Sequence, residues 1–343
     1  MVADFPMVAL HGQASPRDGL VMRMFSICLV AGLMSTPQAD PLQILATTPD
    51  LADVVRHIGG DAVEVQLLVP GAVDPHKVIP KASMLLKLKR ADALVSMGLG
   101  FEHAFLPALL EKVGRDDLGR GASDVSQGGS RHLVGSDFIG QPLEVPTQLD
   151  RGAGVDVHPL GNPHWNTSPQ LMRKYAVGAR DFVSSLRPAS AEVFSTNWKK
   201  WDAELGKSIE HWQAWLAPAR GKPLVTYHRS WPYFADAFGL VISGEVEPKP
   251  GMSPTTRHLA QLAQSMIELD VQLLLLEPWY SESKLGNVPK MTKVSVIKIA
   301  SMSGKEGYLS WMGRLVRQVA SAWDLAEPRV GKEEESSVKK GAD

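Results

Sequence analysis

The chain has 343 residues and nearly balanced charge, with 36 Lys and Arg against 37 Asp and Glu. Hydrophobic residues make up 44% of it and charged residues 21%, which is typical of a globular protein. The balanced charge argues against strong attraction to nucleic acid or to an anionic membrane surface, and no nucleic-acid partner is expected. The length exceeds the roughly 150 residues of a usual single domain, so we expect two lobes.

The N-terminal part of the sequence is typical of a cleavable signal peptide. Arg23 precedes an apolar run of ten residues at 25–34 (FSICLVAGLM), and Ala39 provides a small residue for cleavage. The run is too short to span a bilayer, and a buried core helix is the alternative interpretation. Because acidic residues upstream of Arg23 are unusual for a signal peptide, we hypothesise that translation starts at Met22 or Met24.

The only cysteine, Cys28, lies inside this apolar run. The residues just before it lack the small side chain expected at a lipoprotein processing site, so no lipid anchor is predicted. After cleavage the chain would contain no thiol, and any metal would have to be bound by His, Asp or Glu. We expect the mature protein to be a periplasmic monomer.

Strands and helices alternate in the first half of the predicted mature chain, which indicates a parallel α/β sheet. Strand-like runs occur at 43–47, 63–69 and 93–97, and helical patterns occur at 51–58 and 83–90. Residues 114–146 are rich in Gly, Asp and Ser and are expected to form loops with one strand.

Two long helices are predicted next, at 169–185 and 189–216. At 1.5 Å per residue the second would extend for about 40 Å, enough to run along two lobes. A second α/β unit is predicted after it, from strand-like runs separated by helical patterns. These runs are at 224–227, 241–246, 271–276 and 294–299.

The predicted fold class is therefore α/β, with two lobes that each contain a mostly parallel sheet flanked by helices. The C-terminal residues are charged and free of aromatic side chains, which predicts a disordered tail. The expected segments are an upstream extension plus signal peptide at 1–39, an N-terminal lobe at 40–187, a linking helix at 188–217, a C-terminal lobe at 218–325 and the tail at 326–343.

Three of the ten histidines follow a strand or lie in a proline-rich turn: His76 in PGAVDPHKVIP, His164 in GNPHWNTSP and His228 in VTYHRSWPYF. Ligands of doubly wound sheets bind beyond the carboxyl ends of strands, and prolines fix the backbone around such a site. One histidine in this setting is more often structural, but three in matching settings favour a shared metal site. Surface or hydrogen-bonded core positions are expected for four histidines in helical patterns: His57, His103, His211 and His258.

Five longer stretches occur in one order along residues 42 to 325. They are 44–53 (ILATTPDLAD), 58–80 (IGGDAVEVQLLVPGAVDPHKVIP), 156–164 (DVHPLGNPH), 225–239 (VTYHRSWPYFADAFG) and 245–253 (EVEPKPGMS). Together they resemble the zinc- and manganese-binding components of bacterial metal ABC transporters, specifically the zinc-uptake type. The resemblance implies two α/β lobes joined by one long helix, with the metal site in the cleft between them.

The resemblance also implies that His76, His164 and His228 are metal ligands. The fourth ligand in the family is usually a carboxylate of the C-terminal lobe, but the corresponding stretch at 299–304 (IASMSG) contains no acid. We predict Glu277, at the end of a strand, in this role. A purely structural carboxylate is an equally good interpretation of Glu277, and a water molecule would then complete the site.

Departures from the family pattern occur around these ligands. Ser168 stands where relatives have an aspartate, and it is expected to cap the helix that follows His164. His158 is expected either to orient the site or to act as an alternative ligand. Asp74 is expected to hold its loop or to orient His76. The histidine-rich loop of some relatives is missing, so no auxiliary metal-collecting segment is predicted.

Three neutral imidazoles and one carboxylate suit a tetrahedral zinc site with bond lengths of ~2.0–2.2 Å. One zinc ion is the predicted cargo, whereas manganese, iron and copper are less favoured, although copper and nickel would also bind in vitro. The predicted function is to capture this ion and deliver it to an ABC-transporter permease. The alternatives are a zinc-dependent hydrolase and a manganese- or iron-binding adhesin-like lipoprotein. No HExxH motif is present, and the chain is predicted not to be an enzyme.

The export hypothesis predicts that a chain starting at Met22 is secreted and cut after Ala39. Mass spectrometry of the periplasmic product would identify its first residue. An uncut chain that stays in the cytoplasm would show that the segment is not a signal peptide.

Overall fold

A computed structural model describes residues 40–69, 73–119, 128–147, 156 and 158–328. The predicted signal peptide and most of the predicted tail lie outside the described residues. The segment Asp40–Asp343 is one compact unit that contains two parallel sheets. Within the described part of the chain, no helix is both long and apolar enough to cross a membrane.

The N-terminal lobe contains a four-stranded parallel sheet with the strand order β2-β1-β3-β4. Strands β1 and β3 are almost completely buried, as expected where helices cover both faces of a parallel sheet. The elements of this lobe are β1 (Leu42–Ala46), α1 (Pro49–Gly59), β2 (Val63–Leu67), α2 (Ala82–Arg90), β3 (Ala93–Ser96), α3 (Leu106–Val113), β4 (His132–Val134) and α4 (Pro169–Leu186).

The C-terminal lobe repeats this arrangement with a four-stranded parallel sheet of order β6-β5-β7-β8. In each sheet the first strand of the lobe lies inside the sheet, so the chain changes its winding direction there. The carboxyl ends of the strands at such a point are where doubly wound folds bind ligands. The elements are β5 (Pro223–Thr226), α6 (Pro232–Phe238), β6 (Val241–Glu245), α7 (Thr256–Glu268), β7 (Leu273–Leu276), α8 (Val288–Thr292), β8 (Ser295–Lys298) and α9 (Tyr308–Ala322).

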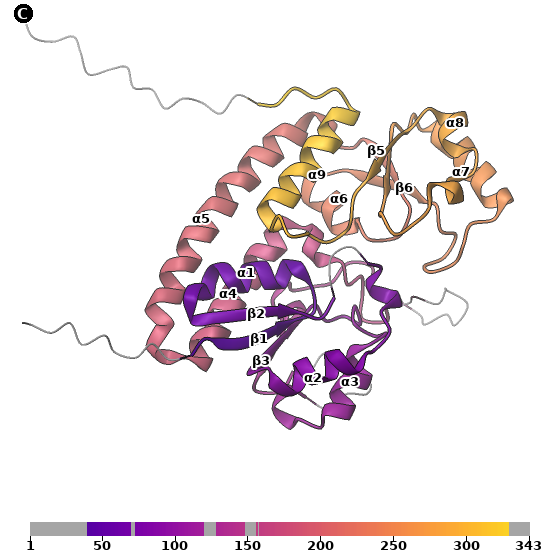
Figure 1. Cartoon of the computed structure of the whole chain (residues 1–343). Helices are drawn as coiled ribbons and strands as arrows, with labels where there is room; N and C mark the ends of the chain where they lie inside the picture. Colours follow the sequence, from indigo (N-terminus) through magenta and orange to yellow (C-terminus); the bar gives the residue numbers. More distant parts are fainter. Residues whose placement is uncertain (1–39, 70–72, 120–127, 148–155, 157, 329–343) are drawn as a thin grey trace, which may run out of the picture. The chain divides into compact units, whose positions relative to one another are not determined.

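Helix α5 (Ala191–Leu216) connects the lobes and runs alongside both of them (Figure 1). Its 26 residues correspond to a length of about 39 Å. It packs against α1 and α4 of the N-terminal lobe and against α9 of the C-terminal lobe. The predicted two-lobe α/β fold with one long helix is thus confirmed. The apolar face of α5 is buried through Phe194, Trp201, Leu205, Ile209, Trp212, Trp215 and Leu216.

One cluster of buried apolar side chains extends through both lobes, from Ile44 on β1 through Leu205 on α5 to Leu315 on α9. Each lobe also has a smaller core of its own, on the side away from this shared cluster. The shared cluster fixes the position of one lobe against the other, because opening the lobes there would expose apolar surface to water.

Polar contacts from α1 add to this connection between the lobes. Asp50 Oδ1 accepts a hydrogen bond of 2.9 Å from the backbone N–H of Ser303. Asp53 Oδ2 accepts one of 2.9 Å from the backbone N–H of Tyr308, where α9 begins. Both aspartates therefore bind backbone groups of the C-terminal lobe.

The strands end within one or two residues of the predicted positions. The helical pattern expected around His103 begins only at Leu106, where α3 starts, because a series of turns precedes it. The predicted cap at Ser168 is confirmed, since its hydroxyl accepts a hydrogen bond of 3.4 Å from the backbone N–H of Leu171.

Candidate metal centre

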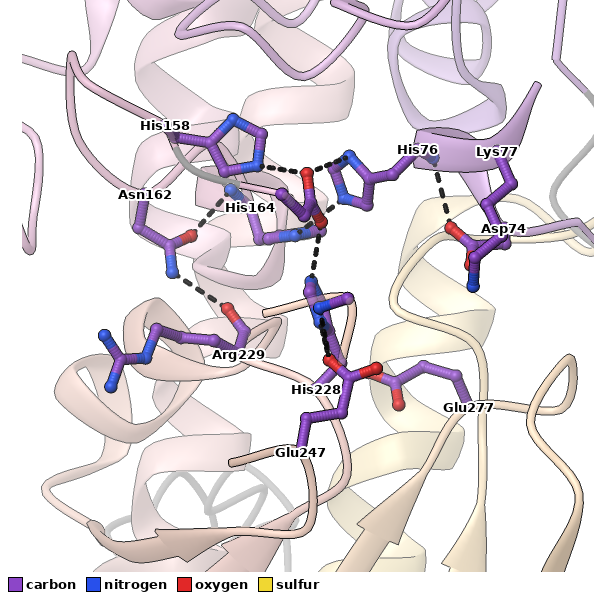
Figure 2. A network of polar contacts seen from close by, with 12 residues as sticks. Asp74, His76, Lys77, His158, Asn162, His164, His228, Arg229, Glu247 and Glu277 are labelled. Carbon is purple, nitrogen blue, oxygen red and sulfur yellow. Dashed lines mark hydrogen bonds and ion pairs between the residues drawn. The ribbon is translucent and has the colours of Figure 1, made fainter. Parts of the chain in front are cut away.

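The structure brings together the three histidines predicted as ligands (Figure 2). In chain order His76 comes after β2 and His228 directly after β5, whereas His164 immediately precedes the 3₁₀ turn Trp165–Thr167 that leads into α4. Their ligand nitrogens all lie within 4.8 Å of one another, and His76 Nε2 is 3.2 Å from His164 Nε2. We call these three residues the inner set.

A second group of ligand side chains shares His76 with the inner set. It consists of His76, His103, Asp156 and His158, whose ligand atoms also lie within 4.8 Å of one another. Asp156 Oδ1 is 3.3 Å from His76 Nδ1, 3.2 Å from His158 Nε2 and 3.9 Å from His103 Nε2. We call these four residues the outer set. The sequence placed Asp156 in a family-like stretch but did not reveal its role.

His76 is held by a short 3₁₀ turn, Pro75–Lys77. Asp74 Oδ1 accepts a hydrogen bond of 3.1 Å from the backbone N–H of His76, and Asp74 Oδ2 lies 2.7 Å from Lys77 Nζ. Asp74 therefore holds the loop, which was one of its two expected roles. The edge of the Phe101 ring packs against the His76 imidazole at a centroid distance of 5.3 Å.

Asn162 connects the turns that carry His164 and His228. Its Oδ1 accepts a hydrogen bond of 2.9 Å from the backbone N–H of His164. Its Nδ2 donates one of 2.8 Å to the carbonyl of Arg229, the neighbour of His228. Tyr233 Oη donates a further bond of 2.8 Å to the Asn162 carbonyl. The sequence reasoning missed this residue, although its position two residues before His164 was a signal.

His228 is oriented by a carboxylate on its far side. Its Nδ1 is 2.8 Å from Glu247 Oε2, which also accepts a bond of 3.0 Å from the backbone N–H of Gly251. Its Nε2 therefore faces the site, 3.5 Å from Asp156 Oδ2. Burial alone would lower the pKa of His228, but the hydrogen bond to Glu247 and the charges of Glu277, Glu247 and Asp156 raise it to about 9.

The other two histidines of the inner set differ from His228 in charge. Burial lowers the pKa of His76 and of His164 well below the usual range, so both are neutral at pH 7. Burial raises the pKa of Asp156, but the imidazoles of His158, His76 and His228 outweigh it and keep this carboxyl ionised. The site therefore offers two neutral imidazoles and a carboxylate without any proton loss.

Glu277, the predicted fourth ligand, lies in neither set. It is fully buried and lies beside Glu247 and His228 (Figure 2). Its Oε1 accepts a hydrogen bond of 3.1 Å from Trp231 Nε1. Burial raises the pKa of Glu277 to about 7, although the charge of His228 partly opposes this rise. At neutral pH this carboxyl is therefore only partly ionised.

His103 lies in a tight turn before α3, so its expected place in a helix is wrong. Residues 98–100 all have positive φ values of 83°, 52° and 79°, a conformation that favours glycine at Gly98 and Gly100. The buried carboxylate of Glu102 holds this turn by accepting bonds of 2.6 and 3.2 Å from the backbone N–H groups of Met97 and Gly98. The turn presents His103 to the outer set.

The remaining described histidines lie outside both sets. His57, His211 and His258 lie on α1, α5 and α7, as expected. His132 is a structural residue of β4, with Nε2 2.8 Å from Ser96 Oγ and Nδ1 3.0 Å from the carbonyl of Leu118.

A cleft of about 240 Å³ opens onto His158, Asp156, His164 and His228. In a tetrahedral site with metal–ligand bonds of about 2.0–2.1 Å, neighbouring ligand atoms lie about 3.3 Å apart. The shortest separations within the two sets, 3.2 and 3.3 Å, match this value. Nitrogen and oxygen donors in this arrangement fit a divalent transition metal ion.

A protein-family model described as "Zinc-uptake complex component A periplasmic" (ZnuA) matches residues 44–322. The chain belongs to the ZnuA family. It is 23% identical over 314 residues to the high-affinity zinc uptake system protein ZnuA of Haemophilus influenzae, covering 82% of this chain and 93% of that protein. It is also 23% identical over 309 residues to the manganese ABC transporter substrate-binding lipoprotein PsaA of Streptococcus pneumoniae, covering 85% and 94%.

Solved structures of a ZnuA and of another metal-bound protein have the same fold. A zinc-bound ZnuA lacking residues 138–173 of its own sequence superposes with a TM-score of 0.67 at 25% identity, covering 84% of this chain and all of that one. The FpvC protein of Pseudomonas aeruginosa in complex with Mn²⁺ superposes with a TM-score of 0.63 at 21% identity, covering 82% and 98%. These proteins are metal-binding components of transporters and not enzymes, which confirms that part of the prediction.

The charge state of His228 predicts how metal binding depends on pH. Because the pKa of His228 is raised to about 9, its site-facing nitrogen is protonated at pH 7.5 and must lose that proton to bind a metal. Zinc binding at pH 7.5 should therefore release about one proton per ion, and affinity should fall about tenfold per pH unit below the pKa. Calorimetry in two buffers of different ionisation enthalpy measures the number of protons released per zinc ion.

Glu247→Gln provides the matched variant, because it removes the carboxylate that stabilises the His228 cation. Its zinc binding should release less than one proton at the same pH. A wild-type value near zero would contradict the assigned charge of His228.

Proposed function

We propose that this chain is the exported solute-binding component of a metal ABC transporter, with zinc as its cargo. It captures one zinc ion through His76, His164 and His228 and delivers it to a membrane permease. The observation that supports the proposal most directly is the inner set itself. Three buried imidazoles from two lobes converge on one point, and two of them are neutral at pH 7.

The donor chemistry favours zinc over manganese. Imidazole nitrogen suits zinc, whereas manganese prefers more oxygen ligands. Relatives at similar identity are named for zinc and for manganese, so sequence likeness does not separate the two ions. The proposal of zinc therefore depends on the three nitrogen donors of the inner set.

A carboxylate would offset the charge of the ion, which is costly to bury between two lobes without compensation. We propose that Asp156 fills this role, because its Oδ2 lies 3.5 Å from His228 Nε2 and its carboxyl is ionised. Glu277, the carboxylate expected from the sequence, is the second candidate for the fourth ligand. Its bond to Trp231 and its raised pKa make it less available to a metal.

The cargo assignment predicts that the metal-stripped protein binds one zinc ion more tightly than one manganese ion. His164→Ala should weaken zinc binding by about a hundredfold or more, since it removes one of the ligands, and should leave the melting temperature of the metal-free protein nearly unchanged. Competition titration against a chromophoric chelator measures both affinities.

His57→Ala is the matched control, because His57 is an exposed histidine on α1 outside both sets. It should bind zinc like the wild type. Tighter binding of manganese than of zinc would overturn the cargo assignment, and full zinc affinity in His164→Ala would overturn the ligand assignment.

The identity of the fourth ligand is tested by replacing each candidate carboxylate with the amide of similar shape. Asp156→Asn should weaken zinc binding by about tenfold or more, because it removes the charge next to His228, whereas Glu277→Gln should change it by only a few-fold. Both are measured at pH 7.5 in the same competition assay. The reverse order of effects would assign the fourth position to Glu277.

A further inference from the structure

The outer set is not needed to explain the inner set, and it includes His103, which lies in none of the family-like stretches of the sequence. His103 and His158 belong only to the outer set, whereas His76 belongs to both sets. His76 and Asp156 contact residues of both sets. The directions of their ligand atoms decide whether both sets can hold a metal at once.

The two ring nitrogens of His76 face different sets. Its Nε2 lies 3.2 Å from His164 Nε2, and its Nδ1 lies 3.3 Å from Asp156 Oδ1. A neutral imidazole has one nitrogen with a free lone pair and one that carries a proton. Neutral His76 can therefore bind a metal in only one of the two sets at a time.

Asp156 is shared in the same way. Its Oδ2 lies 3.5 Å from His228 Nε2 on the inner side, whereas its Oδ1 lies 3.2 Å from His158 Nε2 on the outer side. One carboxylate can thus follow an ion between the two positions by changing which oxygen binds.

Three buried atoms of the outer set make no regular hydrogen bond and lie in ion-pair contact with one another. They are His76 Nδ1, Asp156 Oδ1 and His158 Nε2, and the separations of the oxygen from the two nitrogens are 3.3 and 3.2 Å. Asp156 is only 6% exposed. These separations match the spacing of tetrahedral ligands around one ion.

Exposure decreases from the outer set to the inner set. The side chain of His103 is 42% exposed, that of His158 is 11% exposed and that of His76 is 6% exposed. His164, in the inner set, is 2% exposed. The exposed His103 and the cleft-lining His158 of the outer set are therefore accessible to an ion that arrives from solvent.

We propose that the outer set is a second binding position for the same divalent transition metal ion, occupied on the way to the inner set. This inference rests on the proposed function, because the ion is its cargo. The two positions exclude each other, since they share His76 and Asp156. Inward transfer moves the His76 proton from Nε2 to Nδ1 as the metal moves from Nδ1 to Nε2, with no net change in protons on this ring.

The test removes the inner set and keeps the outer one. His164→Ala combined with His228→Ala leaves all four residues of the outer set in place. This double variant should still bind one zinc ion, with affinity about a hundredfold or more below that of the wild type. Adding His158→Ala should lower the remaining affinity by a further factor of about ten or more, whereas adding His57→Ala should not change it.

Wild-type protein in the same titration separates the two proposals. If the wild type binds zinc tightly and the folded double variant does not bind it, the outer position does not exist and the proposed function stands. If the wild type itself does not bind zinc, the proposed function fails. Remaining affinity that is insensitive to His158→Ala would likewise overturn the outer position.

A kinetic measurement tests the same proposal without altering the inner set. Stopped-flow mixing of wild type and His103→Ala with zinc gives the association and dissociation rates separately. Loss of an intermediate position should slow both rates by the same factor, about threefold or more. Unchanged rates, or two zinc ions bound at once to the wild type, would contradict a shared path for a single ion.

Discussion

The hydrophobic cluster shared by the two lobes is the constraint on which the metal centre depends. It runs from β1 through α5 to α9, and it fixes the carboxyl ends of the two sheets against each other. The ligand-bearing turns follow those strand ends, so their separation is set before any ion arrives. A site of this kind avoids much of the entropy cost of ordering its ligands during binding.

The fixed scaffold also explains why the charges of the centre are arranged asymmetrically. Burial keeps His76 and His164 neutral, whereas Glu247 and its neighbouring carboxylates keep His228 cationic. In the metal-free protein the cation on His228 compensates the charge of the buried Asp156 carboxylate. A bound metal ion takes over that compensation when the proton leaves. The same residues therefore balance the charge of Asp156 with a proton in the metal-free protein and with a metal ion in the loaded protein.

The parts of the centre that could be predicted are those with local signals. His76, His164 and His228 each follow a strand or lie among prolines, and alternating strands and helices predict where their turns meet. Asp156 could not be predicted in its role, because it follows a long stretch without periodicity, and His76, His103 and His228 reach it from three other turns. Which residues such a stretch approaches depends on tertiary packing alone.

Two other differences between the expected and the observed site also arise from tertiary contacts that a local sequence pattern does not reveal. A helical pattern was expected around His103, but glycines at positions 98 and 100 with positive φ, together with buried Glu102, produce a turn instead. Glu277 was expected to point into the cleft because it ends a strand. The structure shows its carboxyl bonded to Trp231, and a sequence does not indicate which buried donor a strand-end acid will find.

The amide of Asn162 has a consequence for unloading. It bonds both the backbone of His164 and the carbonyl of Arg229, so neither ligand turn can shift without pulling on the other. The Arg229 side chain, 45% exposed at the rim of the cleft, is held by Glu245, whose Oε1 lies 2.8 Å from Arg229 Nε. A shift of either turn would therefore displace two ligands together. The ion would then leave in a single cooperative step instead of by stepwise loss of ligands.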